Sequence, residues 1–201
     1  MSDFSYPVVE IFLSVQGEGK RVGTLNHFIR LAGCNLKCPF CDTEFQKPQE
    51  HLRPAEIVER LEEQTTSPQY WRRPSVVITG GEPFVHNLHP LVWALRNGGY
   101  YVAVETNGTL LETPSTKMVL PLIDWVTVSP KTKLSDEALN AAHEVKYVIP
   151  DMEHLVIPLH RRLFFQPEWN NPEAVKRCLE LMKKYPHGRL SIQTHKFVGL
   201  R

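Results

Sequence analysis

Short runs of apolar and β-branched residues alternate with helical segments along this chain, and this alternation constrains the fold more than any other feature. Most of the runs are continuously apolar, which is typical of parallel strands that are covered on both faces. The sequence therefore predicts an α/β fold built on a parallel sheet. The predicted strands are residues 27–31, 76–79, 101–105, 125–129, 145–149, 163–166 and 190–194.

Fewer helices than strands are predicted. The expected helices are residues 54–64, 88–97, 135–138 and 172–184. Ser135 and Asn171 are suitable N-caps for the last two, because their side chains accept hydrogen bonds from the first helical turn. In the last helix, Val175, Leu179 and Met182 are spaced to face the core. The segments expected to form loops are residues 46–53 and 67–74.

The length of the chain bears on how the sheet closes. A complete eight-fold α/β barrel needs about 250 residues, and this chain has 201. We therefore expect one domain, residues 1–201, that forms an incomplete, open TIM-like barrel with a reduced set of helices. Polar motifs follow the strands at their C-terminal ends, where α/β barrels carry their active sites. These motifs are residues 33–43, 79–83, 105–108, 129–131, 166–167 and 193–195.

Composition argues against two classes of partner. The 23 basic and 22 acidic side chains give a formal charge of +1 without a basic run, so no nucleic-acid footprint is expected. No stretch approaches the roughly 18 apolar residues of a membrane span, and the N-terminus lacks a secretory pattern. Clustering of three of the four cysteines predicts reduced thiols and a cytoplasmic location. Cys178 lies in a helical pattern and is expected to be buried.

The loop of three cysteines, Cys34, Cys38 and Cys41, is the strongest chemical signal. Three thiolates can hold three irons of a cubane iron–sulfur cluster and leave the fourth iron open. Because an open position distinguishes catalytic metal sites from structural ones, the loop indicates a reactive centre. The alternative is a zinc site with His27 or His51 as the fourth ligand, although zinc commonly uses two ligand pairs and no second cysteine pair is present.

The spacing Cys-x3-Cys-x2-Cys resembles that of the radical S-adenosylmethionine (radical SAM) enzymes. The resemblance implies a [4Fe-4S] cluster whose open iron binds the amino and carboxylate groups of S-adenosylmethionine (SAM). It also implies reductive cleavage of SAM to a 5′-deoxyadenosyl radical, which abstracts hydrogen from the substrate. The expected architecture is again an open barrel, and the expected partner is a one-electron donor such as flavodoxin.

Further motifs narrow the resemblance to the 7-carboxy-7-deazaguanine synthases, over essentially the whole chain. In order, they are Gln16-Gly17-Glu18-Gly19, Arg30, Cys41-Asp42-Thr43, Thr79-Gly80-Gly81-Glu82-Pro83, Glu105-Thr106-Asn107-Gly108, Val128-Ser129-Pro130-Lys131 and Gln193-Thr194-His195-Lys196. Members of that family convert 6-carboxy-5,6,7,8-tetrahydropterin to 7-carboxy-7-deazaguanine by radical ring contraction, with loss of ammonia. The product leads to queuosine, a modified tRNA base, and the enzymes form homodimers.

One group of residues is assigned to SAM by this resemblance. Two adjacent glycines, Gly80 and Gly81, let backbone approach a ligand without a Cβ clash, and Glu82 would bind the amino group. Asn-Gly alone is a turn signal, so the assignment of Thr106 and Asn107 to SAM rests on the resemblance. The expected SAM contacts are Phe40, Cys41, Asp42, Gly80, Gly81, Glu82, Thr106, Asn107, Ser129, Pro130, Lys131 and Gln166.

A second group is assigned to the pterin, and within it Glu18 and Arg30 are expected, with the three cysteines, to be essential for catalysis. Glu18 would accept hydrogen bonds from ring N–H groups. The Arg30 guanidinium suits the substrate carboxylate, although an ion pair on a strand edge is its structural alternative. His195 is equally compatible with a structural role. The expected substrate contacts are Val15, Gln16, Gly17, Glu18, Arg30, Thr79, Gln193, His195 and Arg201.

Thr43 is expected to bind Mg²⁺, because family members bind the ion at this position and magnesium prefers oxygen ligands. Two rival functions stay open at the level of sequence. One is a radical SAM activase that takes hydrogen from a glycine of a partner enzyme and lacks a small-molecule pocket of Gln16, Glu18 and Arg30. The other is a zinc-stabilised binding module.

Overall fold

The computed structural model describes residues 4–39, 41, 43, 45–65, 75–149, 157–158, 160 and 162–201. Over this part, seven strands run parallel to one another. They are β2 (Leu25–Leu31), β4 (Ser75–Gly80), β5 (Val102–Thr106), β6 (Trp125–Val128), β7 (Glu144–Ile149), β8 (Leu163–Pro167) and β9 (Arg189–Leu190). The predicted parallel α/β sheet is confirmed.

Two antiparallel strands complete the sheet and are not among those predicted from the sequence. β1 (Tyr6–Val15) pairs with β2, and β3 (Glu50–Leu52) pairs with the other edge of β1. The expected loop over residues 46–53 is therefore wrong in part, because β3 lies inside it. The sheet order is β3-β1-β2-β4-β5-β6-β7-β8-β9 among the described residues, an open arrangement that agrees with the incomplete barrel.

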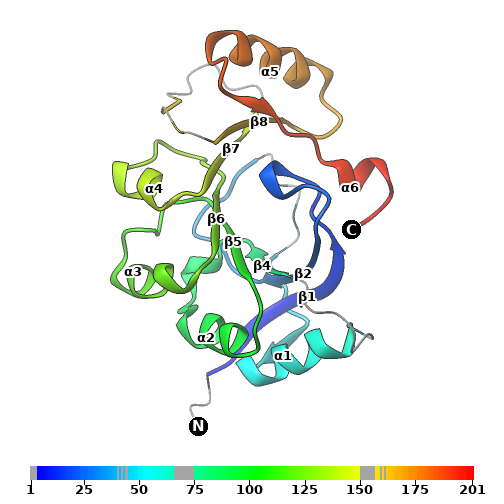
Figure 1. The fold of residues 1–201 in the computed structure, drawn as a ribbon, viewed down its shortest axis with the longest axis vertical. Helices are drawn as coiled ribbons and strands as arrows, with labels where there is room; N and C mark the ends of the chain where they lie inside the picture. Colours follow the sequence, from blue (N-terminus) through cyan, green and yellow to red (C-terminus); the bar gives the residue numbers. More distant parts are fainter. Residues whose placement is uncertain are drawn as a thin grey trace.

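Helices cover the outer face of the curved sheet (Figure 1). They are α1 (Pro54–Glu63), α2 (His89–Asn97), α3 (Pro114–Val119), α4 (Asp136–Ala141) and α5 (Pro172–Lys184), and a further short helix is α6 (Thr194–Phe197). Ser135 and Asn171 cap α4 and α5 as predicted, by accepting hydrogen bonds from Ala138 N and Ala174 N at 3.1 Å. α3 is not predicted from the sequence; Pro114 opens it after the Thr113 cap. No helix in the described ranges has the length and apolar character needed to cross a bilayer.

The core lies between this helical layer and the sheet. Ile57 and Leu61 of α1 and Leu91 and Leu95 of α2 are fully buried. Cys178 of α5 is also fully buried, as expected.

The predicted inner face of α5 is wrong at two of its three positions. Val175 and Leu179 are 41% and 50% exposed, while Ala174 and Cys178 are buried and Met182 packs partly against the core. A shift by one residue rotates a helical position by about 100°. The smaller side chains of Ala174 and Cys178 face the sheet, where they allow closer packing than the larger pair would.

The C-terminal region differs from the predicted strand over residues 190–194. β9 stops at Leu190, and α6 begins at Thr194. Ser191 N still donates to Phe165 O of β8 at 2.9 Å, but Thr194 N donates to Gly17 O at 3.0 Å. The chain thus leaves the sheet to contact the loop after β1, and α6 lies on the side between β8 and β1 (Figure 1). Residues 67–74, expected to form a loop, lie outside the described residues.

Candidate active site

The cysteine loop follows β2 and is fixed against the end of β4 by backbone contacts. Gly81 N donates to Leu31 O at 3.2 Å, and Glu82 N donates to Gly33 O at 2.9 Å. A Cβ on Gly80 would lie 2.1 Å from Leu31 O, and one on Gly81 would lie 2.2 Å from Gly33 O. The double glycine is therefore required first by the close passage of two backbone segments.

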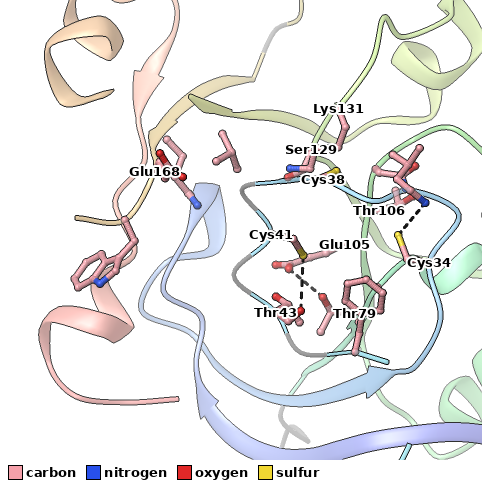
Figure 2. Close-up of a pocket in the computed structure, with 18 of the residues that line it drawn as sticks. Cys34, Cys38, Cys41, Thr43, Thr79, Glu105, Thr106, Ser129, Lys131 and Glu168 are labelled. Carbon is pink, nitrogen blue, oxygen red and sulfur yellow. Dashed lines mark hydrogen bonds between the residues drawn. The ribbon is translucent and has the colours of Figure 1, made fainter. Parts of the chain in front are cut away.

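A cavity of about 430 Å³ opens beside this loop, at the C-terminal ends of the parallel strands. We call it the cluster chamber. Figure 2 shows all three loop cysteines around it, with side chains from several strand ends facing them. Eight of the residues assigned to SAM line the chamber: Cys41, Gly80, Gly81, Thr106, Asn107, Ser129, Lys131 and Gln166.

The donor set of this chamber suits a cubane iron–sulfur cluster. Cys34, Cys38 and Cys41 are free thiols on one wall. In the described part of the chain, no three His, Cys, Asp or Glu side chains are close enough together to hold a single metal ion. A cubane does not require that, because each thiolate binds a separate iron and the ligands surround the cluster.

Other predicted SAM contacts are placed differently. Glu82 and Pro130 do not line the cluster chamber. Glu82 is fully buried, and its carboxylate accepts hydrogen bonds from Thr106 Oγ1 at 2.7 Å and from Asn107 N at 2.6 Å. Burial raises the pKa of Glu82, and the bonds from Asn107 and Thr106 oppose that rise. Glu82 thus holds the motif after β5, while its contact with SAM stays a prediction. Phe40 and Asp42 lie outside the described residues.

A second cavity, of about 240 Å³, adjoins the first. We call it the substrate chamber. Thr43, Thr79, Glu105, Gln166 and Gln193 line both cavities, so the two chambers share a wall. All nine residues assigned to the pterin line the substrate chamber: Val15, Gln16, Gly17, Glu18, Arg30, Thr79, Gln193, His195 and Arg201. The structure thus brings together residues from both ends of the chain, and their binding roles stay predictions.

The Glu18 carboxylate of the substrate chamber is held through both of its oxygens. Its Oε1 accepts a hydrogen bond from Gln193 Nε2 at 2.9 Å, and its Oε2 forms an ion pair with Lys146 Nζ. Burial acts to raise the pKa of Glu18, but the charge of Lys146 and the hydrogen bonds from Lys146 and Gln193 hold it below its ordinary value. Glu18 is therefore an ionised acceptor at neutral pH.

The two glycines beside Glu18 are explained by close packing. A Cβ on Gly17 would lie 2.0 Å from His195 Nδ1. Gly19 has a φ of +66°, and a Cβ there would lie 2.4 Å from Glu144 Oε1. The segment carrying Glu18 is thus held between α6 and β7, without room for side chains on either side of the carboxylate. Burial lowers the pKa of His195, which favours a neutral ring at neutral pH.

Arg30 combines the two roles considered from the sequence. Its Nε donates to Glu10 Oε1 at 2.7 Å across the β1–β2 pair, so the strand ion pair is present. Arg30 also lines the substrate chamber. The second oxygen of Glu10 forms an ion pair with Arg201 Nη2 at 3.1 Å. Two guanidinium groups therefore share one carboxylate at this wall.

Four charged residues among those described at the site are absent from the sequence-based assignments, and one of them, Glu168, lines the cluster chamber. Glu105 lines both chambers and accepts from Gln16 Nε2 at 3.0 Å and Thr79 Oγ1 at 3.4 Å. Lys196 also lines both chambers. Lys146 lies behind Glu18 on β7. The signal for Lys146 is a lysine inside the predicted strand over residues 145–149, which carries no other charged side chain, and such a lysine points to a buried partner of opposite charge.

Comparisons with known proteins agree with this geometry. The family model described as the Radical SAM superfamily matches residues 28–186. The 7-carboxy-7-deazaguanine synthase of Synechocystis sp. is 37% identical, over 98% of this chain and 94% of the relative. The Bacteroides thetaiotaomicron protein of the same name is 35% identical, over 96% and 97%. The crystal structure of QueE from Escherichia coli matches with a TM-score of 0.69 and 30% identity, over 95% of both chains.

Proposed function

Since the chain belongs to the family of 7-carboxy-7-deazaguanine synthases within the radical SAM superfamily, we propose that it converts 6-carboxy-5,6,7,8-tetrahydropterin to 7-carboxy-7-deazaguanine with loss of ammonia, as a lyase of queuosine biosynthesis. The observation that carries this proposal is the pair of adjoining chambers. One chamber is lined by the three cysteines. The other is lined by hydrogen-bond acceptors that match the ring N–H groups of a pterin and by guanidinium groups that match its carboxylate.

The residues of the cluster chamber divide into ligands and contacts for SAM. Cys34, Cys38 and Cys41 would hold a [4Fe-4S] cluster, and this cluster, once reduced by one electron, would supply the electron that cleaves SAM to methionine and a 5′-deoxyadenosyl radical for hydrogen abstraction. The backbone at Gly80 and Gly81 would contact SAM, and the polar ends of β6 and β8, which line the same chamber, would bind its ribose and carboxylate. No side chain needs to act as a nucleophile, because the protein supplies position, electrostatics and exclusion of water.

The substrate chamber orients the pterin. Ionised Glu18 accepts from ring N–H groups, and the Gln193 amide, already bonded to Glu18, extends that polar wall. Arg30 binds the pterin carboxylate through its guanidinium group, at the wall that also carries Arg201. Thr79 and Glu105 lie on the shared wall, where the reacting carbon must face SAM.

Replacing Arg30 with lysine should raise the KM for the pterin about 10- to 100-fold, because a guanidinium–carboxylate contact contributes about 1.5–3 kcal/mol and lysine cannot reproduce two parallel bonds. Steady-state kinetics at saturating SAM would measure it. Arg60→Lys is the matched control, since Arg60 pairs with Glu50 at 3.1 Å outside both chambers. Equal KM values for the two variants would contradict the assignment of Arg30.

We also propose that Thr43 supplies an oxygen ligand to Mg²⁺, together with substrate and water oxygens. Thr43 lines both chambers, which supports a site that assembles with the substrate. Thr43→Ala should raise the Mg²⁺ concentration for half-maximal turnover about tenfold. Thr43→Ser, which keeps the hydroxyl, should not. An unchanged magnesium dependence in the alanine variant would rule this ligand out.

The remaining proposals concern the setting of the enzyme. We propose that residues 1–201 act as one radical SAM domain, that the protein forms a homodimer, and that it works in the cytoplasm. A one-electron donor such as flavodoxin would reduce the cluster. A reducing compartment suits three free thiolate ligands.

Anaerobic incubation of the reconstituted enzyme with SAM, dithionite, Mg²⁺ and the tetrahydropterin tests the main proposal. Mass spectrometry should detect 7-carboxy-7-deazaguanine, with ammonia released and SAM used catalytically. Cleavage of SAM without that product would instead favour an activase of a partner enzyme. A preparation with bound zinc and no sulfide would favour the zinc-stabilised module, whereas about four irons and four sulfides per chain would exclude it.

A further inference from the structure

Lys146 is a buried lysine that the reaction outlined above does not use. Its side chain is 4% exposed on β7, and it lines neither chamber. Lysine is almost never fully buried unless it is paired. Burial disfavours its charged form, but the carboxylates of Glu18, Glu105 and Glu144 outweigh burial and raise the pKa of Lys146.

The three carboxylates around Lys146 have different contacts. Glu144 accepts from Thr127 Oγ1 and Lys20 N, both at 2.9 Å. Glu105 accepts from Gln16 and Thr79. Glu18 forms the direct ion pair with Lys146 Nζ and at the same time faces the substrate chamber. Lys146 therefore influences the substrate chamber through the Glu18 carboxylate, which it contacts directly.

The protonation state of Glu18 decides what the chamber can recognise. An ionised carboxylate only accepts hydrogen bonds, whereas a protonated one also donates. The Glu18 side chain is 13% exposed, and burial without a cation would favour the protonated form. The other ionisable groups around it are His195 of α6, Lys131 after β6, Glu105 of β5 and Glu144 of β7.

We propose that Lys146 is a positioning residue that keeps Glu18 ionised and fixed in orientation, so that the chamber selects a ring edge with adjacent N–H donors. The 2-amino and ring N–H groups of a pterin form such an edge. This inference rests on the proposed function, because it takes Glu18 as a substrate contact. It adds Lys146, which lies outside the chamber, as the residue that determines which hydrogen-bonding groups Glu18 selects in the substrate.

A double-mutant cycle tests the proposal through binding rather than turnover. The variants are Glu18→Gln, Lys146→Met and the double variant, and the probe is 6-carboxy-5,6,7,8-tetrahydropterin, titrated anaerobically by calorimetry without reductant. Glu18→Gln and Lys146→Met should each weaken binding about 10- to 100-fold, the range for a hydrogen bond to a charged group. The double variant should bind no more weakly than Glu18→Gln, because Lys146 acts through Glu18.

The pH dependence gives a readout that a purely structural role would not change. In the native enzyme the Glu18 pKa lies low, so its ionisation adds no slope near neutral pH. In Lys146→Met that pKa rises, and binding should tighten as pH increases through it. Comparison with the double variant removes the titrations of His195 and of the ligand. Lys20→Met, at an exposed position outside both chambers, should bind like the native enzyme.

Each outcome has a distinct meaning. Native binding by Lys146→Met, or much weaker binding by the double variant than by Glu18→Gln, would overturn the role of Lys146. Native binding by Glu18→Gln would instead overturn Glu18 as a substrate contact, and with it the proposed arrangement of the pterin. If Lys146→Met does not fold, Lys146→Arg keeps the charge and should keep the native pH profile. A profile with a new slope in that variant would contradict the proposal.

Discussion

Alanine at any one of Cys34, Cys38 or Cys41 should abolish the formation of 5′-deoxyadenosine. Each of the three thiols lines the cluster chamber, and each would hold a different iron. Losing one ligand leaves two thiolates for a cluster that needs three from this loop. Iron and sulfide analysis after anaerobic reconstitution should show a fall from about four of each per chain. SAM cleavage is followed by chromatography.

Cys178→Ala is the control for this series. Cys178 is fully buried in α5, and burial raises the pKa of its thiol to about 12, so it stays protonated and unreactive at neutral pH. Its replacement should leave iron content and SAM cleavage unchanged and cost about 1 kcal/mol in stability through a small cavity. A cysteine-loop variant that still produced 5′-deoxyadenosine would defeat the cluster assignment.

The parallel part of the sheet was predictable because its strands are continuously apolar and end in polar motifs. β1 was not, because only Tyr6, Val8 and Ser14 of its ten residues are buried, and its pairing is interrupted by a bulge between Val8 and Glu10. The end of β9 depends on Thr194, whose hydroxyl donates to Gly17 O, 177 positions away. Local sequence carries no signal for such a contact.

The site was predictable where chemistry is concentrated in motifs and unpredictable where it depends on packing. The cysteine loop and the residues assigned to the substrate line two adjoining chambers, and their binding roles stay predictions. The burial of Glu82 behind Thr106 is set by how the ends of β4 and β5 meet. Lys146 stands in a strand, and only the folded barrel places it against Glu18, 128 positions away. Neighbouring residues do not encode such pairings.

Gly80→Ala should be among the most damaging substitutions outside the cysteines. Gly80 has a φ of +142°, and an added Cβ would lie 2.1 Å from Leu31 O and 2.7 Å from Leu31 N. Both are backbone atoms of β2, just before the cysteine loop, so neither can rotate away. Relief requires β2 and β4 to separate where Gly81 N donates to Leu31 O. We expect a loss of about 3 kcal/mol or more, together with loss of the cluster.

Gly99→Ala separates backbone strain from the steric effect. Gly99 also has a positive φ, +77°, but a Cβ there would have no atom within 4 Å. The loss of folding stability in Gly99→Ala should therefore be the backbone conformational penalty alone, about 1–2 kcal/mol. With about 2–4 °C per kcal/mol for a chain of this size, Tm should fall by about 2–8 °C in Gly99→Ala and by about 6 °C or more in Gly80→Ala.

Thermal unfolding and iron retention, measured on both variants under anaerobic conditions, decide the matter. Gly99→Ala should keep its iron, because Gly99 follows α2 and lines neither chamber. Gly80→Ala should lose iron, because the clash is transmitted through Leu31 and Gly33 to Cys34. Equal losses of Tm with full iron retention in both variants would show that the double glycine serves only its own backbone conformation. The close approach of β4 to the cysteine loop would then not be what holds the cluster ligands in place.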